Sequence, residues 1–477
     1  MTDTQTRSTV RGRLDGYFEI SKRGSTWGTE VRGGLVTFVT MAYIVILNPI
    51  ILSGGKDVLH QSLQFNQVAA VTALTAGVMT ILFGVIARLP FAFAAGLGIN
   101  SFLAVSVVGQ VTWPEAMGLV VIEGLIIVLL SATGLRRLIF NAVPYELKIA
   151  ITVGIGLFIA FIGLVDAGFV KSTGLGSPPV GLGSNGSIAT VPTLIFVITL
   201  LITGVLVARK VKGGILIGLI AGTVVAVIAE AVLHLGGQPK NPAGWSLSVP
   251  QITGNWFAVP DLGLIGHVSF DFGRIGALAA IMLIFTLVFS NFFDAMGTMT
   301  GLSEEAGLAD KHGNFPRLKS ALIIEGVGAV AGGLTSGSSN TVFIESGAGI
   351  GEGARTGFAN VITGALFLLA MFFTPIAQLV PSEVAAAALV IVGALMMAQI
   401  RSIDLRDFTL LLPVFLTVVV MPLTYSIANG IGVGFIAWVV IRAFAGKARQ
   451  ISPLLWIVAA GFAIYFARGP IEVLFAH

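Results

Sequence analysis

The chain has 477 residues, of which 55% are hydrophobic and 10% are charged, and its net charge is +4. Because a soluble globular domain carries about 25% charged residues, this composition excludes an ordinary soluble protein and indicates a membrane protein. The absence of cysteine excludes disulfides, thiolate catalysis and cysteine metal sites, and the small net charge does not suggest nucleic-acid binding.

Apolar runs long enough to cross a bilayer recur along the chain. The first half predicts seven spans, at 31–53, 68–87, 91–108, 115–134, 146–168, 190–208 and 213–235. After a polar connection, the second half predicts seven more, at 275–301, 317–334, 339–353, 357–378, 384–400, 408–426 and 428–446. A last apolar run, 453–466, fits either a fifteenth span or an interfacial helix. The sequence therefore predicts an all-α polytopic protein with fourteen transmembrane spans.

The distribution of basic residues gives the expected orientation. If the N-terminus is cytoplasmic, most of the 27 Lys and Arg residues fall in cytoplasmic segments. Those that fall outside are Lys56, Lys171, Lys240 and Arg274. This asymmetry follows the positive-inside rule. Residues 1–29 are polar and lack the pattern of a secretory signal, so we expect a multi-pass protein of the inner (plasma) membrane with a cytoplasmic N-terminus.

Seven spans per half place the second half upside down relative to the first. Inverted repeats with a binding site at their interface are a known plan of transporters. The third and tenth spans share a defect, because each is short and carries an extended stretch followed by glycines, FAFAAGLG and NTVFIESGAG. We expect each to form a short strand joined to a half-helix, and the two strands to pair. Irregular backbone inside a membrane is tolerated only when it is buried in protein or lines a cavity. We therefore expect the binding site to lie where these two broken spans meet.

Glu345 lies where the strand of the tenth span meets its half-helix. A carboxylate at this place is expected to accept hydrogen bonds from the polar edge of a ligand, although a helix-capping role would also explain it. Its neighbours Phe343 and Ser346 are expected to contact the substrate, with Asn340 in a supporting role.

Asp294 lies deep in the eighth span, and an ionisable residue there marks a functional site by default. Asn291, Asp294 and Thr298 fall on one helical face, so we expect Asp294 to bind substrate and the other two to support it. Because removal from water and a nearby carboxylate both disfavour a charged carboxyl group, Asp294 and Glu345 are the candidates for proton coupling.

Asn100 and Ser101 follow the glycines of the third span. Their position in the first repeat corresponds to that of the residues around Glu345 in the second. An amide offers a donor and an acceptor to a ligand, whereas a helix N-cap is the alternative role. Glu123 and Glu325 are further acids inside spans, and we expect structural or conformational roles for both. The histidines are scattered, and the sequence carries no phosphate-binding glycine loop with its lysine.

Three strings of the chain resemble one family. These are GGLVTFVTMAYIVILNP in the first span, NFFDAMGTMTGL in the eighth and NTVFIESGAGIGEGARTG in the tenth. They look like the AzgA-like purine permeases of the nucleobase–cation symporter superfamily, and the resemblance covers nearly the whole chain. Asp294, Glu345 and Asn100 match the family's eighth-span acid, tenth-span acid and third-span amide. Asn291 stands where some relatives carry a second acid, which leaves the substrate range open.

The resemblance implies purine uptake by proton symport, with the proton as coupling ion and no other cofactor. It also implies elevator-type alternating access between a core domain of spans 1–4 and 8–11 and a gate domain of spans 5–7 and 12–14. A homodimer through the gate domain and contacts with membrane lipid are further expectations. The expected boundaries are 1–30 for a cytoplasmic segment, 31–134 and 273–378 for the core, 135–235 and 379–446 for the gate, 236–272 for an extracellular connection, and 447–477 for a C-terminal segment.

Two other functions stay open on the sequence alone. An anion carrier of the sulfate-permease type shares this architecture, but two acids in the site argue against an anionic substrate. A cation channel is the other alternative, although paired broken helices favour alternating access over a continuous pore. An intramembrane enzyme is less favoured, since no nucleophile–base pair is visible.

Overall fold

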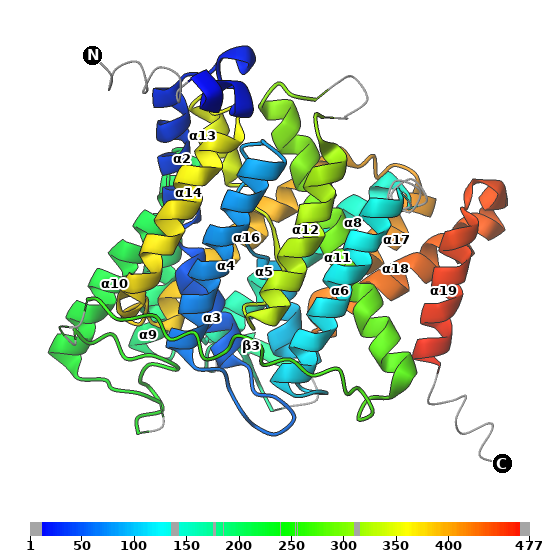
Figure 1. The fold of residues 1–477 in the computed structure, drawn as a ribbon. Helices are drawn as coiled ribbons and strands as arrows, with labels where there is room; N and C mark the ends of the chain where they lie inside the picture. Colours follow the sequence, from blue (N-terminus) through cyan, green and yellow to red (C-terminus); the bar gives the residue numbers. More distant parts are fainter. Residues whose placement is uncertain are drawn as a thin grey trace.

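The structure is a computed structural model that describes residues 12–134, 143–174, 178–184, 186–238, 240–252, 254, 256–309 and 315–467. It is a bundle of helices with two small two-stranded sheets (Figure 1). Within the described residues, ten helices are long and apolar enough to cross a membrane. The four other predicted spans are the third and tenth, which are broken, and the ninth and thirteenth, which are shorter helices. The predicted all-α class with fourteen spans is confirmed.

The first half runs from the N-terminus to the long connection. Its elements are α2 (Trp27–Met41), α3 (Ile44–Gly54), α4 (Phe65–Ile86), β1 (Phe93–Ala95), α5 (Leu97–Phe102), η2 (Leu103–Val107), α6 (Trp113–Thr133), α8 (Tyr145–Asp166), α9 (Val191–Ala208) and α10 (Gly214–Leu233). A hairpin of β2 (Val170–Ser172) and β3 (Val180–Leu182) lies between α8 and α9.

The second half repeats this order. Its elements are α11 (Gly276–Glu305), α12 (Leu318–Leu334), β4 (Asn340–Val342), α13 (Ser346–Gly351), α14 (Gly357–Ala370), α15 (Thr374–Ala377), α16 (Ser382–Met397), α17 (Phe408–Leu423) and α18 (Ile427–Arg442). The last apolar run forms α19 (Pro453–Phe466) at one edge of the bundle. At 14 residues it is about 21 Å long, which is shorter than the hydrocarbon core of a bilayer.

The first span differs from the expected single helix over 31–53. It begins earlier, at Trp27, because the Thr26 hydroxyl accepts the Thr29 N–H and caps the helix. It is then interrupted at Ala42 and Tyr43, where Val45 N–H bonds to Ala42 O at 3.2 Å and tightens the turn. Such a tightened turn inside a helix is frequent at functional positions. The interruption separates α2 from α3 and places Tyr43 between them.

Helix contacts repeat between the two halves, as inverted repeats require. α4 of the first half packs against α14 of the second, and their counterparts in the opposite repeats, α12 and α6, pack against each other. In the same way, the contact of α9 with α16 corresponds to the contact of α17 with α8. The contact of α9 with α10 in the first half likewise corresponds to that of α17 with α18 in the second. The third and tenth spans, which correspond to each other, meet through their own strands.

Glycines bring α4 and α14 into backbone contact. A Cβ atom added to Gly357 would lie 1.8 Å from the Gly84 carbonyl oxygen, and one added to Gly364 would lie 2.5 Å from the Gly77 oxygen. The two pairs are two helical turns apart, so the helices touch along a stripe of small residues. Such stripes allow close packing of helices in membranes, where the hydrophobic effect does not drive helices together.

We expect Gly357→Ala to lower the free energy of unfolding by about 1–3 kcal/mol, because the methyl group has to push the α4 backbone away. Denaturant unfolding of the purified protein in detergent measures this change. Gly461→Ala is the matched control, since nothing lies within 4 Å of a Cβ atom at Gly461. Equal stability of the two variants would contradict the close packing of α4 on α14.

Candidate functional site

The third span of one repeat and the tenth span of the other are joined by two short strands, one from each span. β1 and β4 are antiparallel, with Ala94 opposite Thr341. Hydrogen bonds at both ends extend the pair, from Gly96 N–H to Ser339 O and from Phe343 N–H to Ala92 O, each at 2.9 Å. The strands thereby satisfy each other's backbone groups away from water. The predicted pairing of these segments is confirmed.

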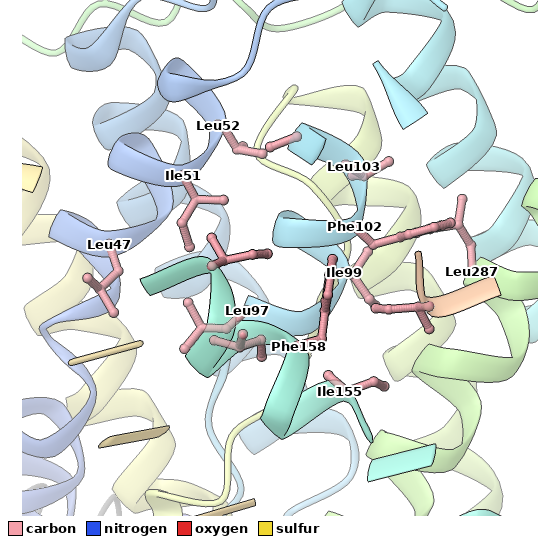
Figure 2. Packing of buried hydrophobic residues seen from close by; sticks show 14 of the residues in the cluster. Leu47, Ile51, Leu52, Leu97, Ile99, Phe102, Leu103, Ile155, Phe158 and Leu287 are labelled. Carbon is pink, nitrogen blue, oxygen red and sulfur yellow. The ribbon is translucent and has the colours of Figure 1, made fainter. Parts of the chain in front are cut away.

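A half-helix leaves each strand on its C-terminal side. α5 begins after Gly96 and α13 begins after Glu345, and neither start has a side-chain cap. The first N–H groups of α13 are instead bound by the preceding backbone, from Ser346 N–H to Phe343 O at 3.1 Å, Gly347 N–H to Ile344 O at 2.9 Å and Ala348 N–H to Glu345 O at 3.0 Å. Figure 2 shows how α5 is held: its apolar side chains meet those of α3, α8 and α11. A Cβ atom at Gly98 would lie 2.6 Å from the Ile155 side chain, so α5 and α8 pack closely.

Glu345 is half-buried at the start of α13 and is held from the first span. The hydroxyl group of Tyr43, which is fully buried, donates a hydrogen bond to Oε1 of Glu345. Thr40 donates to the backbone oxygen of Glu345 at 3.3 Å. The interruption between α2 and α3 therefore positions Tyr43 to hold the carboxyl group.

Asp294 is half-buried on α11, a helix that packs against both α13 and β4. It lies within electrostatic range of Glu345, so the structure brings the two predicted acids together. Among the described residues its carboxyl group has no hydrogen-bond partner. A carboxyl group in that position is able to accept a donor from a ligand or to bind a proton.

Asn100 is fully buried and is held by a second amide. Its Nδ2 donates to Asn48 Oδ1 at 2.6 Å, and Asn48 in turn donates to Thr72 Oγ1 at 2.8 Å and Gly337 O at 3.0 Å. Asn100 Oδ1 and Ser101 Oγ are buried without a partner in the described part of the chain. Buried polar atoms are normally paired, so these two oxygens are candidates for ligand contact after a change of conformation.

Asn291 belongs to a separate buried cluster. Its Nδ2 donates to Glu123 Oε1 at 2.6 Å and to Ser339 Oγ at 2.9 Å. Glu325 on α12 lies within electrostatic range of Glu123. This cluster ties α6 and α11 to the residue before β4, which fits the supporting role expected for Asn291 and Glu325.

The remaining predicted residues have packing roles or half-buried positions. Ser346 Oγ is buried and accepts the Ala92 N–H at 2.9 Å, so it fastens the end of β1 rather than facing open space. Phe343 is buried in the main hydrophobic cluster. Asn340 donates to Ser338 O at 3.2 Å and keeps its buried Oδ1 unpaired within the described residues. Thr298 is half-buried on α11.

Sequence reasoning missed Tyr43 and Asn48. Both lie in the first-span string used for the family resemblance, and a tyrosine and an asparagine within an apolar run were the available signal. Their partners lie far away along the chain, so periodicity could not reveal them.

Two cavities of the described structure are lined by residues other than Glu345 and Asp294. One of about 400 Å³ lies between the end of α3, α15 and the long connection, and the other, of about 440 Å³, lies between α8, α18 and α19. We nevertheless place the candidate site at the strand crossing, because Tyr43, Glu345 and Asp294 bring ionisable groups together there, whereas the polar side chains of the first cavity are serines and glutamines.

Solved structures share the fold. The transmembrane domain of the bicarbonate transporter BicA of a cyanobacterium superposes with a TM-score of 0.61 at 17% identity, covering 84% of this chain and 96% of that one. The murine anion transporter Slc26a9 superposes with a TM-score of 0.60 at 11% identity, covering 88% of this chain and 69% of that one. At such identities the likeness concerns the fold alone, and it supports the arrangement of seven plus seven spans.

Sequence relatives are closer and cover almost the whole chain. The guanine/hypoxanthine permease PbuG of Bacillus subtilis is 38% identical over 94% of this chain and 98% of its own length. The adenine permease AdeP of Escherichia coli is 34% identical over 96% of both chains. A putative permease of Methanocaldococcus jannaschii is 37% identical over 95% of this chain and 98% of its own. The model described as "Permease family" matches residues 28–433. The resemblance to purine permeases is thus confirmed, and the chain belongs to this permease family of multi-pass membrane transporters.

Proposed function

We propose that the protein imports purine nucleobases by proton symport, with a preference for oxopurines. The observation that carries the proposal is the Glu345 carboxyl group, held by Tyr43 at the strand crossing and within electrostatic range of Asp294. Guanine and hypoxanthine present an N–H donor at N1, and guanine adds an amino group beside it. An ionised carboxylate accepts such donors well. The names of the relatives, guanine/hypoxanthine and adenine permeases, support the same class of substrate.

Competition binding tests the substrate class. Purified protein is mixed with radiolabelled hypoxanthine, guanine, adenine, uracil or sulfate, and each is competed against the others. We expect guanine and hypoxanthine to compete with one another and to displace adenine, because adenine N1 is an acceptor. Tight adenine binding without oxopurine binding would contradict the preference, and sulfate binding alone would favour an anion carrier. Single-channel recording separates a carrier from a channel, which gives unitary currents.

We further propose that transport moves a core domain, residues 31–134 and 273–378, against a gate domain, residues 135–235 and 379–446. In this proposal the protein lies in the plasma membrane with its N-terminus in the cytoplasm, and gate domains pair into a homodimer. The strand crossing lies within the core, so substrate and proton move with it.

An ion pair within the described part of the chain joins the two proposed domains. Glu352 at the end of α13 contacts Lys212, which lies between α9 and α10, and it also contacts Arg32 of α2 at 2.9 Å. Lys212 belongs to the proposed gate, whereas Arg32 and Glu352 both belong to the proposed core. A movement of core against gate has to separate Lys212 from Glu352 and leaves Arg32 beside Glu352.

We expect a cross-link between positions 212 and 352 to stop transport. The chain has no cysteine of its own, so Lys212→Cys with Glu352→Cys provides one defined pair for a short thiol-specific cross-linker. Arg32→Cys with Glu352→Cys is the matched control, because both positions lie in the core, and its cross-linked form is expected to keep transporting. Uptake into proteoliposomes before and after cross-linking, and after cleavage of the linker, measures the effect. Unchanged uptake in the cross-linked 212/352 variant would rule out the proposed movement.

A further inference from the structure

We propose that the cavity between α8, α18 and α19 binds the phosphate-bearing headgroup of an anionic phospholipid. The cavity has a volume of about 440 Å³, and its polar lining comes from Glu146, Arg442, Arg449, Gln450 and Ser452. It lies at the same end of the bundle as the N-terminus (Figure 1), where the sequence places most basic residues. The family model ends at residue 433, so the lining residues from Trp438 onward lie beyond it, whereas Glu146 lies within it.

The segment that leads from α18 into α19 forms one side of the cavity, which residues 449–452 and Pro453, the first residue of α19, line. After α18 the chain reverses through residues 443–452, with Gly446 at φ 76°, and α19 then packs back onto α18 and α11. Phe462 fixes this packing: it contacts Phe285 and Phe435 edge-on, and a Cβ atom at Gly432 would lie 2.5 Å from its ring. The packing of α19 therefore anchors the end of the segment that lines the cavity.

Two arginines give the cavity its positive charge. The guanidinium group of Arg442 lies over the ring of Trp438, 4.7 Å from its centre, and its buried Nε has no hydrogen-bond partner within the described residues. Neither Arg442 nor Arg449 forms an ion pair in the part of the chain that the structure describes. Glu146 is the acid in the lining, and Lys148 lies within electrostatic range of it. The guanidinium groups are thus left to bind an anion, and guanidinium matches phosphate geometry.

The surroundings of the arginines favour a lipid over a free anion. Phe444 is 91% exposed and Ile457 is 70% exposed, and Val440 and Trp456 are exposed beside them in sequence. Exposed apolar side chains on a membrane protein face acyl chains, and tryptophan is enriched at the membrane interface. Basic pockets between transmembrane helices at the cytoplasmic side bind anionic headgroups. A phosphate held by Arg442 and Arg449 would therefore have its acyl chains against α18 and α19.

Native mass spectrometry of the purified full chain tests the proposal. The protein is mixed with phosphatidylglycerol or phosphatidylcholine, and retained lipid is measured for the wild type, for Arg442→Gln/Arg449→Gln, and for the control Arg401→Gln/Arg406→Gln, whose exposed arginines lie outside the cavity. We expect the wild type and the control to retain phosphatidylglycerol in preference to phosphatidylcholine. The Arg442/Arg449 variant is expected to bind phosphatidylglycerol about thirtyfold more weakly.

Inorganic phosphate alone separates the two sources of the anion. We expect millimolar phosphate to leave phosphatidylglycerol in place, whereas displacement would assign the cavity to a free anion and overturn the lipid proposal. Equal lipid retention by the wild type and the Arg442/Arg449 variant would overturn it as well. Circular dichroism and denaturant unfolding check that both double variants are folded. Because the readout is lipid binding and not transport, the result is independent of the proposed function.

Discussion

Glu345→Gln is expected to weaken guanine binding by about 10- to 100-fold. A hydrogen bond to a charged group contributes about 1.5–3 kcal/mol, and the substitution removes the charge that accepts the N1 and amino donors of guanine. The glutamine side chain is able to donate to N1 of adenine, so adenine binding should fall less than guanine binding. Equilibrium binding of both purines to the purified variant measures this change of ratio, which a general loss of folding would not produce.

Two further variants refine this result. Tyr43→Phe keeps the ring in its buried place and removes only the hydroxyl group that holds Glu345. It should therefore weaken guanine binding by a smaller factor, because the carboxylate remains. Glu304→Gln removes the same charge from an exposed position near the end of α11 and should leave binding unchanged. Guanine affinity of Glu345→Gln within twofold of the wild type would refute the anchoring role of Glu345.

The broken spans could be predicted because their backbone pattern is local. In both spans a short extended stretch is followed by two glycines, Gly96 and Gly98 in the third span and Gly347 and Gly349 in the tenth. Because the two breaks occupy corresponding places in the two repeats, each one supports the prediction of the other. The confirmed strand pair follows from this symmetry. Span positions were also predictable, since hydropathy is read from neighbouring residues.

The side-chain partners within the site could not be predicted in this way. Tyr43 and Glu345 are 302 residues apart, and Asn48 and Asn100 are 52 apart. Helical periodicity placed Asn291 on the face of Asp294 but could not show that its amide is committed to Glu123, 168 residues away. Contacts between spans depend on how the two repeats pack, and a single sequence carries no direct signal of that packing.

The same limit applies to α19. Its sequence is apolar enough for a transmembrane span, but its length is only 14 residues. Hydropathy alone therefore did not decide between a fifteenth span and an interfacial helix. The structure shows it packed on α18 through Phe462 and Gly432. By packing on α18 the apolar run anchors the preceding residues 449–452, which line the basic cavity at Arg442. No pattern in the run itself indicates this role.

Asp294→Asn is expected to abolish accumulation driven by a pH gradient while retaining measurable purine binding. Asp294 is half-buried, it lacks a hydrogen-bond partner among the described residues, and it lies within electrostatic range of Glu345. Two carboxyl groups so placed disfavour a state in which both are charged, so one of them is suited to take up a proton as the substrate binds. An asparagine keeps the size of the side chain and removes the titratable group, so exchange of purine across the membrane should continue when no gradient is applied.

Proteoliposomes with an imposed pH gradient measure this effect, and radiolabelled hypoxanthine reports both accumulation and exchange. Asp404→Asn is the matched control, because Asp404 is exposed beside Arg406 and its substitution should keep gradient-driven uptake. Since the two acids interact, their protonation is a property of the pair, and a full loss of binding in Asp294→Asn would mean that Asp294 anchors substrate together with Glu345. Unimpaired accumulation would remove Asp294 from the coupling step and would leave Glu345, or a buried acid such as Glu325, to carry the proton.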